Sequence, residues 1–237
     1  MVMQAGLKRT AQPLNWLTQY NEGTKTMYKL YYSPGACSKA PHIALHETGA
    51  EHEAIRVQLH NPAGPDKNLL AANPRLQVPV LDDGGQIIRE GAAILIYILD
   101  KEQSPLLPAT GTERGRALEW LCWCNASLHP AYGAAFAAPN VYKNKSTQDD
   151  ILAMMHGKIQ KMWDDADAHL AKNKYLAGSD LTIGDILMTV IGQWKVPGFG
   201  DNQPVPGPNV QRVFKDVISR PSWAAATAME EGQKKAA

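Results

Sequence analysis

The segment at residues 28–48 limits what this chain can fold into more than any other part of it. A strand-like run at residues 28–32 is followed by a Ser-Pro-Gly turn and then by a helix-like run at residues 38–48. The turn delivers Cys37 to the first turn of that helix, where unpaired backbone N–H groups and the positive end of the helix dipole favour a thiolate over a thiol. We therefore expect the pKa of Cys37 to be lowered, and we interpret this residue as a reactive thiol.

A proline further along the chain adds a second constraint. The sequence Gln-Val-Pro-Val-Leu at residues 77–81 predicts a turn that enters a strand through an X-Pro bond. Proline enters a buried strand only rarely, except at its first residue or at a sheet edge. Together with a cysteine at a helix start, this layout is typical of a thioredoxin-like half-sheet. There the proline is typically cis and leaves main-chain N–H and C=O groups free for a peptide-like ligand.

The charge of the chain argues against two classes of partner. Its 24 Lys and Arg residues and 23 Asp and Glu residues are interleaved and leave a formal net charge of +1. No basic stripe therefore marks a surface for nucleic acid or for a membrane. No apolar run approaches the roughly 20 residues that span a bilayer. The sequence predicts neither a nucleic acid nor a membrane as a partner.

The cysteines and histidines give no sign of a disulfide framework or of a metal site. The three cysteines are odd in number and match no common zinc pattern, which indicates a reducing compartment, and we expect the cytoplasm. Cys122 and Cys124 lie two apart on a helix and are interpreted as packing residues. Apart from His129, the histidines form no ligand set at metal spacing, so we expect no metal. These histidines are His42, His46, His52, His60, His156 and His169.

The pattern of apolar residues divides the chain into five stretches. Residues 1–26 are expected to be an N-terminal extension without a secretory signal. Residues 27–103 alternate strand-like and helix-like runs in the order β-α-β-α-β-β-α. Residues 104–112 contain two prolines and predict a linker, residues 113–231 an all-helical domain, and residues 232–237 a tail. We therefore expect an α/β thioredoxin-like domain with a mixed four-stranded sheet, followed by an all-α helical bundle domain.

Apolar periodicity predicts five helices in the second half of the chain. They cover residues 113–138, 148–171, 185–194, 210–219 and 221–231. The first is expected to end at Pro139, because proline interrupts a helix. Thr182 and Asp185 form a start signal of the capping-box type for the third.

Four short motifs carry a family resemblance. They are Tyr-Tyr-Ser-Pro-Gly-Ala-Cys-Ser at residues 31–38, Asn-Pro-Arg-Leu-Gln-Val-Pro at 73–79, Arg-Glu-Gly-Ala-Ala-Ile at 89–94 and Leu-Thr-Ile-Gly-Asp at 181–185. In this order and spacing they resemble the cytosolic glutathione transferases, and the Pro-Gly-Ala-Cys-Ser version resembles the bacterial beta class. The resemblance covers about residues 27–231. It implies a homodimeric enzyme that activates the thiol of glutathione, its co-substrate, for attack on a small hydrophobic electrophile.

The resemblance implies a glutathione site built from the second and third motifs. Val78, before the proline, would pair its main chain with the cysteinyl unit of glutathione. Glu90 would take the ammonium of the γ-glutamyl end, and N–H groups at the start of the following helix would face its carboxylate. The residues that would bind glutathione are Gln77, Val78, Pro79, Glu90, Gly91 and Ala92.

The resemblance also implies which residues lie beside the glutathione sulfur. Cys37, Tyr32 and His129 match the beta-class residues at that place. Lowering the pKa of a thiol by about two units takes roughly 2.7 kcal/mol, which a helix start, a hydroxyl or thiol donor and a cationic or donating histidine could share. We expect the electrophile in a cleft between the two domains. The aromatic side chains expected to line that cleft are Trp123, Tyr132 and Phe136.

Two positions depart from the beta-class pattern. Relatives often place a lysine in the loop after the second strand, where Lys67 is the nearest candidate here. They also often carry an asparagine on the first long helix, about two turns before the histidine. In this chain that position corresponds to Cys122.

Two other functions stay open on the sequence. Cys37 could act as the thiol of a monothiol, glutathione-dependent disulfide reductase or of a lyase, although the residues after it supply no Cys-x-x-Cys partner. The chain could instead be a non-catalytic protein that binds glutathione or a hydrophobic ligand.

Overall fold

The computed structural model describes residues 27–59 and 62–235 of the chain. The predicted N-terminal extension at residues 1–26 lies outside the described residues. Within the two described ranges, no helix is both long enough and apolar enough to cross a membrane.

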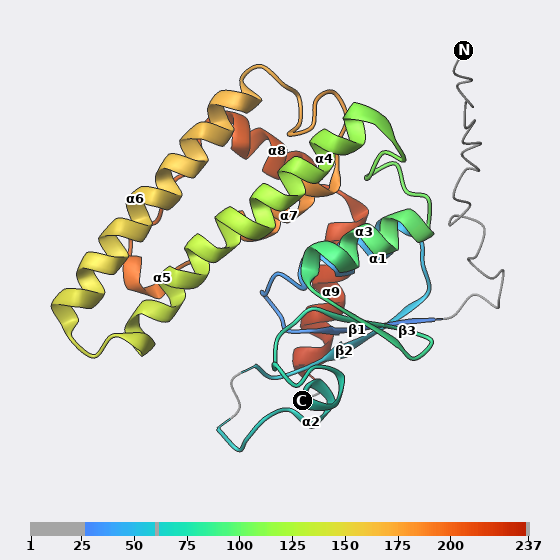
Figure 1. Ribbon diagram of the computed structural model, residues 1–237, viewed down its shortest axis with the longest axis horizontal. Helices are drawn as coiled ribbons and strands as arrows, with labels where there is room; N and C mark the ends of the chain where they lie inside the picture. Colours follow the sequence, from blue (N-terminus) through green and yellow to red (C-terminus); the bar gives the residue numbers. More distant parts are fainter. Residues whose placement is uncertain (1–26, 60–61, 236–237) are drawn as a thin grey trace, which may run out of the picture.

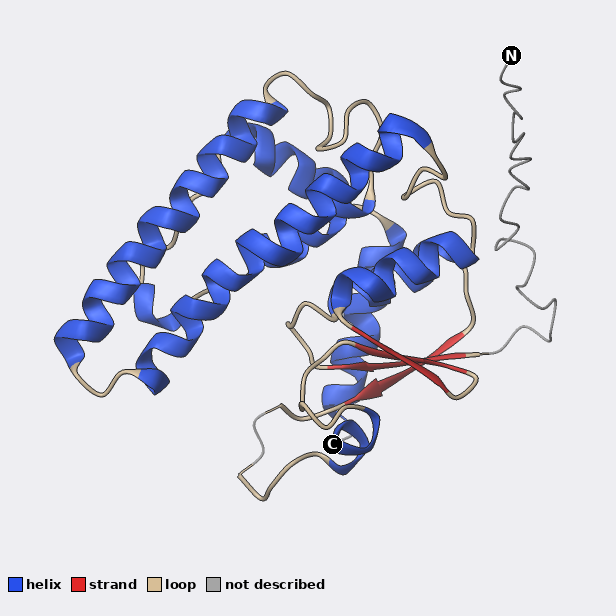
Figure 2. Cartoon of the chain, viewed as in Figure 1, coloured by secondary structure: helices blue, strands red, loops and turns tan. Residues whose placement is uncertain are grey.

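A mixed four-stranded sheet forms the centre of the first domain, with the strand order β2-β1-β3-β4 (Figure 1, Figure 2). β1 (Tyr28–Tyr32) runs parallel to β2 (His52–Arg56) and antiparallel to β3 (Val80–Asp83). β4 (Gln86–Arg89) pairs antiparallel with β3 through a two-residue turn of glycines with positive φ. The expected fold of this domain is confirmed.

Helices cover both faces of the sheet (Figure 1). α1 (Lys39–Thr48) and α3 (Gly91–Lys101) pack on one face, and α2 (Lys67–Ala72) lies on the other. Alternate residues of a strand point to opposite faces. Leu30 therefore packs into the core under α1 and α3, whereas Tyr31 packs against the smaller cluster that includes residues of α2.

The rest of the described chain is helical, as the sequence predicts. Its elements are α4 (Gly111–Trp123), the π-helical turn η2 (Cys124–Leu128), α5 (His129–Val141), α6 (Lys145–Leu170), α7 (Ile183–Gly192), the 3₁₀ turn η3 (Pro197–Phe199), α8 (Pro208–Ile218) and α9 (Pro221–Lys235). α4, η2 and α5 form one long rod, and α6 runs beside α5 (Figure 1). α7 lies at the centre of this domain, where all its residues from 183 to 191 are buried.

The structure corrects two helix ends that the sequence predicts. Pro139 does not end the first long helix, because α5 continues to Val141. In the last turn of a helix a proline removes only one hydrogen bond close to the end, which limits its effect. α9 continues to Lys235 and so takes up most of the predicted tail at residues 232–237.

The start of α7 has the capping box that the sequence predicts. The backbone N–H of Thr182 donates to Asp185 Oδ2 at 2.9 Å, and the backbone N–H of Leu176 donates to Oδ1 at 2.9 Å. Asp185 is fully buried, and this burial raises its pKa to about 6. The carboxylate therefore ties the loop before α7 to the helix itself.

The last helix returns to the first domain, where α9 packs against α1 (Figure 1). Arg220, just before α9, donates from Nε and Nη2 to the two carboxylate oxygens of Glu47 on α1, each at 2.6 Å. The Ser222 hydroxyl also donates to Glu47. These contacts hold the last helix, and with it the helical domain, against α1 of the first domain.

Candidate active site

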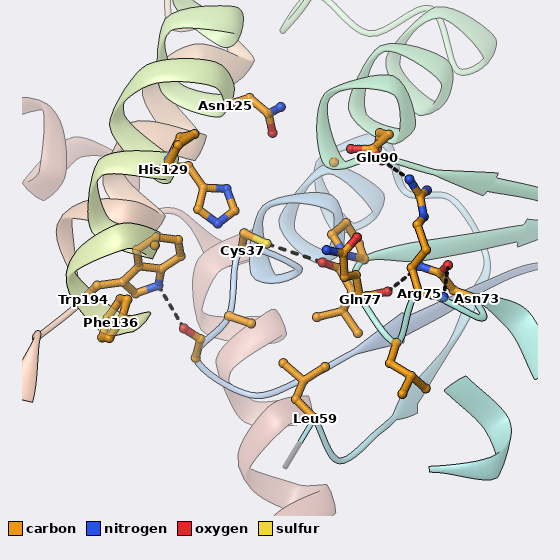
Figure 3. A pocket seen from close by; sticks show the side chains of 18 residues that line it. Cys37, Leu59, Asn73, Arg75, Gln77, Glu90, Asn125, His129, Phe136 and Trp194 are labelled. Atoms are coloured by element: carbon orange, nitrogen blue, oxygen red, sulfur yellow. Dashed lines mark hydrogen bonds and ion pairs between the residues drawn. The ribbon is translucent and has the colours of Figure 1, made fainter. Parts of the chain in front are cut away.

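A cavity of about 620 Å³ lies between the two domains. The loop after β1, the segment before β3 and the start of α3 line it from the sheet side, and the α4–η2–α5 rod and the chain after α7 line it from the helical side (Figure 3). The two motifs that the sequence singles out, around Cys37 and around Val78, therefore meet at one cavity.

Cys37 lies immediately before α1 rather than inside its first turn, because Ser38 is the N-cap residue and the helix begins at Lys39. Its Sγ donates to the backbone carbonyl of Val78 at 3.6 Å (Figure 3). Burial raises the pKa of Cys37 to about 11, and the backbone N–H groups of Cys37 and Ser38 offset this only in part. The prediction of a lowered pKa is therefore wrong, since loss of hydration outweighs the helix start. At pH 7 this side chain is a thiol that donates a hydrogen bond.

The segment before β3 is held in place from within. The peptide bond between Val78 and Pro79 is cis, as the proline pattern predicts. Asn73 is almost fully buried, and its side-chain amide donates to the carbonyl of Gln77 at 2.9 Å while its Oδ1 accepts from the N–H of Arg75 at 3.1 Å. One buried amide thus fixes the main chain on which Gln77, Val78 and Pro79 line the cavity.

The start of α3 presents a charged pair and a helix N-terminus to the same cavity. Arg75 Nη1 lies 3.0 Å from Glu90 Oε1, and Glu90 has a positive φ of 72° (Figure 3). Glu90 and Gly91 line the cavity, but Ala92 does not, because it packs against the core of the first domain. Of the two residues expected to present N–H groups here, only Gly91 faces the cavity.

His129 and Trp194 line the cavity from the helical domain. The ring of His129 points toward Cys37 and lies 5.0 Å from the ring of Trp194, measured between centroids (Figure 3). Burial lowers the pKa of His129, so the imidazole is neutral at pH 7. Trp194 donates from Nε1 to the carbonyl of Gly35 at 2.9 Å. This hydrogen bond connects the helical domain to the loop that carries Cys37.

Several aromatic residues predicted for the site lie elsewhere. Tyr32 is fully buried under α1, 5.4 Å from the ring of His42, because its position on β1 points to the inner face of the sheet. Tyr132 is buried against α6, where its hydroxyl accepts from Trp163 Nε1 at 3.0 Å. Trp123 packs against the core and does not line the cavity. Of the aromatic side chains predicted for the cleft, Phe136 alone lines the cavity that the described residues form.

Among the cavity residues that the sequence does not single out, Trp194 and Asn125 carry polar groups on their side chains. The expected asparagine position falls on Cys122, but Cys122 is exposed, and Asn125 faces the start of α3 instead (Figure 3). Its Oδ1 lies 3.5 Å from where a Cβ on Gly91 would stand. The spacing of four residues between Asn125 and His129 could have indicated it. Lys67, the lysine candidate, opens α2 and does not line the cavity.

Comparison with known proteins places the whole arrangement in one family. Residues 26–100 match the family model "Glutathione S-transferase, N-terminal domain". Glutathione S-transferase GstA of Escherichia coli O157:H7 is 31% identical over 172 residues, which cover 70% of this chain and 81% of that protein. A sphingomonad glutathione S-transferase complexed with glutathione has a TM-score of 0.71 at 33% identity, covering 86% of this chain and 98% of its own. The beta class enzyme of Sphingomonas chungbukensis has a TM-score of 0.70 at 30% identity, covering 85% and 98%. The chain therefore belongs to the glutathione S-transferase family.

Proposed function

We propose that this protein binds glutathione in the cavity between its domains and activates the glutathione thiol for attack on a small hydrophobic electrophile, as a transferase of the beta-class type. The observation that carries the proposal is the meeting of three features at one cavity. These are the thiol of Cys37, the main chain of Val78 and the start of α3 behind Glu90. Similarity to a beta class enzyme and to a glutathione-complexed transferase supports it.

The sheet domain would hold the tripeptide. The main chain of Val78 would pair with the cysteinyl unit, at the carbonyl that now accepts from Cys37. Glu90 would bind the ammonium of the γ-glutamyl end, and the helix start at Gly91 would face its carboxylate. Arg75, paired with Glu90, lies where it can contribute a further charge-assisted hydrogen bond to that carboxylate.

Neutral donors would activate the sulfur. Because Cys37 stays protonated and His129 is neutral at pH 7, each can donate one hydrogen bond to a glutathione thiolate. Each such donor contributes about 1 kcal/mol or more to a charged acceptor, and the helix start adds about 0.5 kcal/mol. Together they approach the roughly 2.7 kcal/mol that a two-unit decrease in pKa requires. The loss of one donor should slow the reaction without stopping it.

The same geometry disfavours the alternative in which Cys37 reduces disulfides. Disulfide exchange needs a thiolate. Because burial raises the pKa of Cys37 to about 11, this side chain is a thiol rather than a thiolate at pH 7. Conjugation requires Cys37 only to donate a hydrogen bond. The protonated thiol already donates one to the carbonyl of Val78.

Cys37 variants separate the two chemistries. We expect Cys37→Ser to keep most of the conjugation of glutathione to an aryl halide, because serine still donates. Cys37→Ala should lower kcat/KM by about tenfold, corresponding to one lost donor of about 1.4 kcal/mol. Cys122→Ala is the matched control, since this exposed cysteine lies outside the cavity, and it should have no effect. A wild-type protein that reduces a glutathione mixed disulfide rapidly, does not conjugate, and loses reduction in Cys37→Ser would instead be a reductase.

Binding can be tested apart from chemistry. Isothermal titration calorimetry with glutathione should show Glu90→Gln raising the dissociation constant by about tenfold, because an amide replaces a charge-assisted acceptor for the ammonium. Glu113→Gln, on the exposed start of α4, is the control and should bind as the wild type does. Absence of any heat with the wild type would favour a binding protein for some other hydrophobic ligand.

The remaining parts of the proposal concern the second substrate and the assembly. The rings of Phe136 and Trp194 line the cavity beside His129 and would hold an apolar electrophile against the sulfur. We also propose a homodimer in the cytoplasm, which membership of this family leads us to expect. Light scattering on the purified full chain should then give twice the mass of one chain.

A further inference from the structure

Three histidines outside the cavity come together on the inner side of the first domain. His42 and His46 stand one turn apart on α1, and His52 is the first residue of β2. One ring nitrogen from each lies within 4.8 Å of the others. The sequence alone indicates no ligand set among these histidines, because their spacing along the chain does not show that the fold brings them together. The chain reverses at Gly49, which has a positive φ of 65° and carries β2 back along the end of α1.

The ring nitrogens that meet here lack the hydrogen bonds that buried polar atoms need. His42 is fully buried, and neither of its ring nitrogens has a hydrogen-bond partner among the described residues. The same holds for the buried Nε2 atoms of His46 and His52. A buried polar atom without a partner costs about 1–3 kcal/mol, so four of them in one cluster need a reason. A ligand shared by the three rings would supply it.

The ring hydrogen bond of His52 and the lowered pKa values of His42 and His46 suit a metal ion. His52 Nδ1 lies 2.9 Å from the carbonyl of Ala50, and since a carbonyl only accepts, this nitrogen carries the proton and leaves a lone pair on Nε2. Histidines that bind metals typically donate their other N–H to such a group. Burial, reinforced by the other two histidines and by Lys39, lowers the pKa of His42 to about 3, and the pKa of His46 is also lowered. Neutral imidazoles do not have to lose a proton before they bind a metal.

We propose that His42, His46 and His52 form a binding site for zinc(II), with three imidazole ligands and a fourth position for water. Imidazole suits zinc, copper and nickel, and zinc accepts a set of three histidines. Nitrogens at about 2.0–2.1 Å from a tetrahedral zinc ion stand about 3.3 Å apart, so rotations of the rings would close the present spacing.

The surroundings of the cluster are compatible with a cation. The positive charge that acts on His42 is that of Lys39 on α1. The ammonium of Lys39 is 4.0 Å from the carboxylate of Glu230 and lies above the ring of Trp223 at 4.7 Å. Glu230 thus offsets the charge of Lys39 beside the site. None of the three histidines lines the cavity between the domains, so zinc would connect α1 to β2 without entering the transferase chemistry.

Metal binding to the untagged full chain, stripped with a chelator and then desalted, tests the proposal. Titration with zinc(II) by calorimetry should show one site per chain. Cobalt(II), used as a probe, should give the visible absorption of a tetrahedral complex without a thiolate charge-transfer band. X-ray absorption of the zinc-loaded wild type should show imidazole nitrogens at about 2.0 Å. Sulfur at about 2.3 Å, or no binding, would overturn the proposal.

Variants assign the ligands. His46→Gln and His52→Gln change the two partly exposed members of the cluster, and each should weaken zinc binding by at least about tenfold. His156→Gln, on α6 outside the cluster, should bind zinc as the wild type does. Zinc should raise the melting temperature of the wild type and of His156→Gln but not of the other two variants. Equal affinity in all four proteins would contradict the assignment. Conjugation activity, which none of these changes should affect, checks that each variant is folded.

Discussion

Burial holds two titratable side chains in neutral forms, and each neutral form has its own chemistry. It raises the pKa of Cys37 to about 11 and lowers the pKa of His42 to about 3. At both residues the loss of hydration destabilises the charged form by more than the neighbouring groups stabilise it. The result is a thiol that donates a hydrogen bond at the cavity and an imidazole whose lone pair is available at neutral pH.

The low pKa of His42 predicts how stability depends on pH. The unfolded chain binds a proton at His42 below about pH 6.5, whereas the folded chain resists this down to about pH 3. The contribution of His42 is therefore fully present above about pH 6.5 and is lost as the pH falls, by at most about 1.4 kcal/mol per pH unit. His42→Phe removes this dependence, so its free energy of unfolding should decrease less steeply between pH 7 and pH 4.5.

Denaturant unfolding at several pH values, with a chelator present, measures the two slopes. His46 also has a lowered pKa, and the causes of this shift, burial and His52, are present in both proteins. Parallel curves for the wild type and His42→Phe would show that His42 titrates normally in the folded chain.

For single residues, the sequence predicts position in the fold better than it predicts the direction of a pKa shift. The turn before α1 predicts a cysteine at the start of that helix, and Cys37 lines the cavity there, because Ser, Pro and Gly define the turn locally. The direction of its pKa shift depends on how deeply the folded chain buries the thiol, which residues far away in the sequence decide. Tyr32 is misassigned because a strand-end tyrosine gives no local sign of which face it occupies.

Two glycines on different helices should respond in opposite directions to the same substitution. A Cβ on Gly192, the last residue of α7, would stand 2.2 Å from the tip of the Phe214 ring. Phe214 is buried with its ring 5.8 Å from that of Trp163, so it cannot move aside freely. We expect Gly192→Ala to lower the free energy of unfolding by about 1–3 kcal/mol. Gly157→Ala, in the middle of α6 with no atom within 4 Å, should raise it by about 0.5–1 kcal/mol.

Urea unfolding of both variants checks this pair. Because the two substitutions add the same methyl group to a helix, an increase in the free energy of unfolding for both would show that packing between α7 and α8 is looser than the structure has it.

The sequence predicts those helices and strands whose boundaries are set by residues next to them in the chain. The capping box of Thr182 and Asp185 and the paired glycines between β3 and β4 fix their elements through neighbouring residues. The π-helical turn η2 has no such signal, since its residues fit an ordinary helix equally well.

At the scale of the whole molecule, the contact between α9 and α1 joins the helical domain to the sheet domain and contributes to the free energy of unfolding. Glu47→Ala leaves Arg220 and the Ser222 hydroxyl without their partly buried acceptor. We expect a loss of about 1–2 kcal/mol in the free energy of unfolding. Asp165→Ala breaks the exposed pair with Lys161 and should change it by less than about 0.5 kcal/mol. Thermal or urea unfolding of both variants provides the comparison.

The same contact should weaken in acid. Hydrogen bonds from Arg220 and then from Ser222 lower the pKa of Glu47 below its ordinary value of 4.5. A carboxylate with a depressed pKa contributes stability above its unfolded pKa, and this contribution is lost as the pH falls through the folded value. The difference between wild type and Glu47→Ala should therefore shrink below about pH 4.5.

Domain order follows from the sequence, but the contacts between distant segments do not. Alternating and then helical periodicity predicts a sheet domain followed by a helical one. The apolar pattern of α9 does not show that this helix packs against α1. The histidine cluster likewise depends on the chain reversal at Gly49 as well as on the spacing of His42 and His46. Such contacts are fixed by packing in three dimensions.

The π-helical turn η2 has a consequence for how this chain can change over generations. It adds one residue to the rod between α4 and α5, and each residue of an α-helix turns the following side chains by about 100°. Deleting a single codon within residues 124–128 would rotate both His129 and Phe136 from their present positions at the cavity. One insertion or deletion at this joint could therefore exchange the set of side chains offered to the second substrate in a single mutational step.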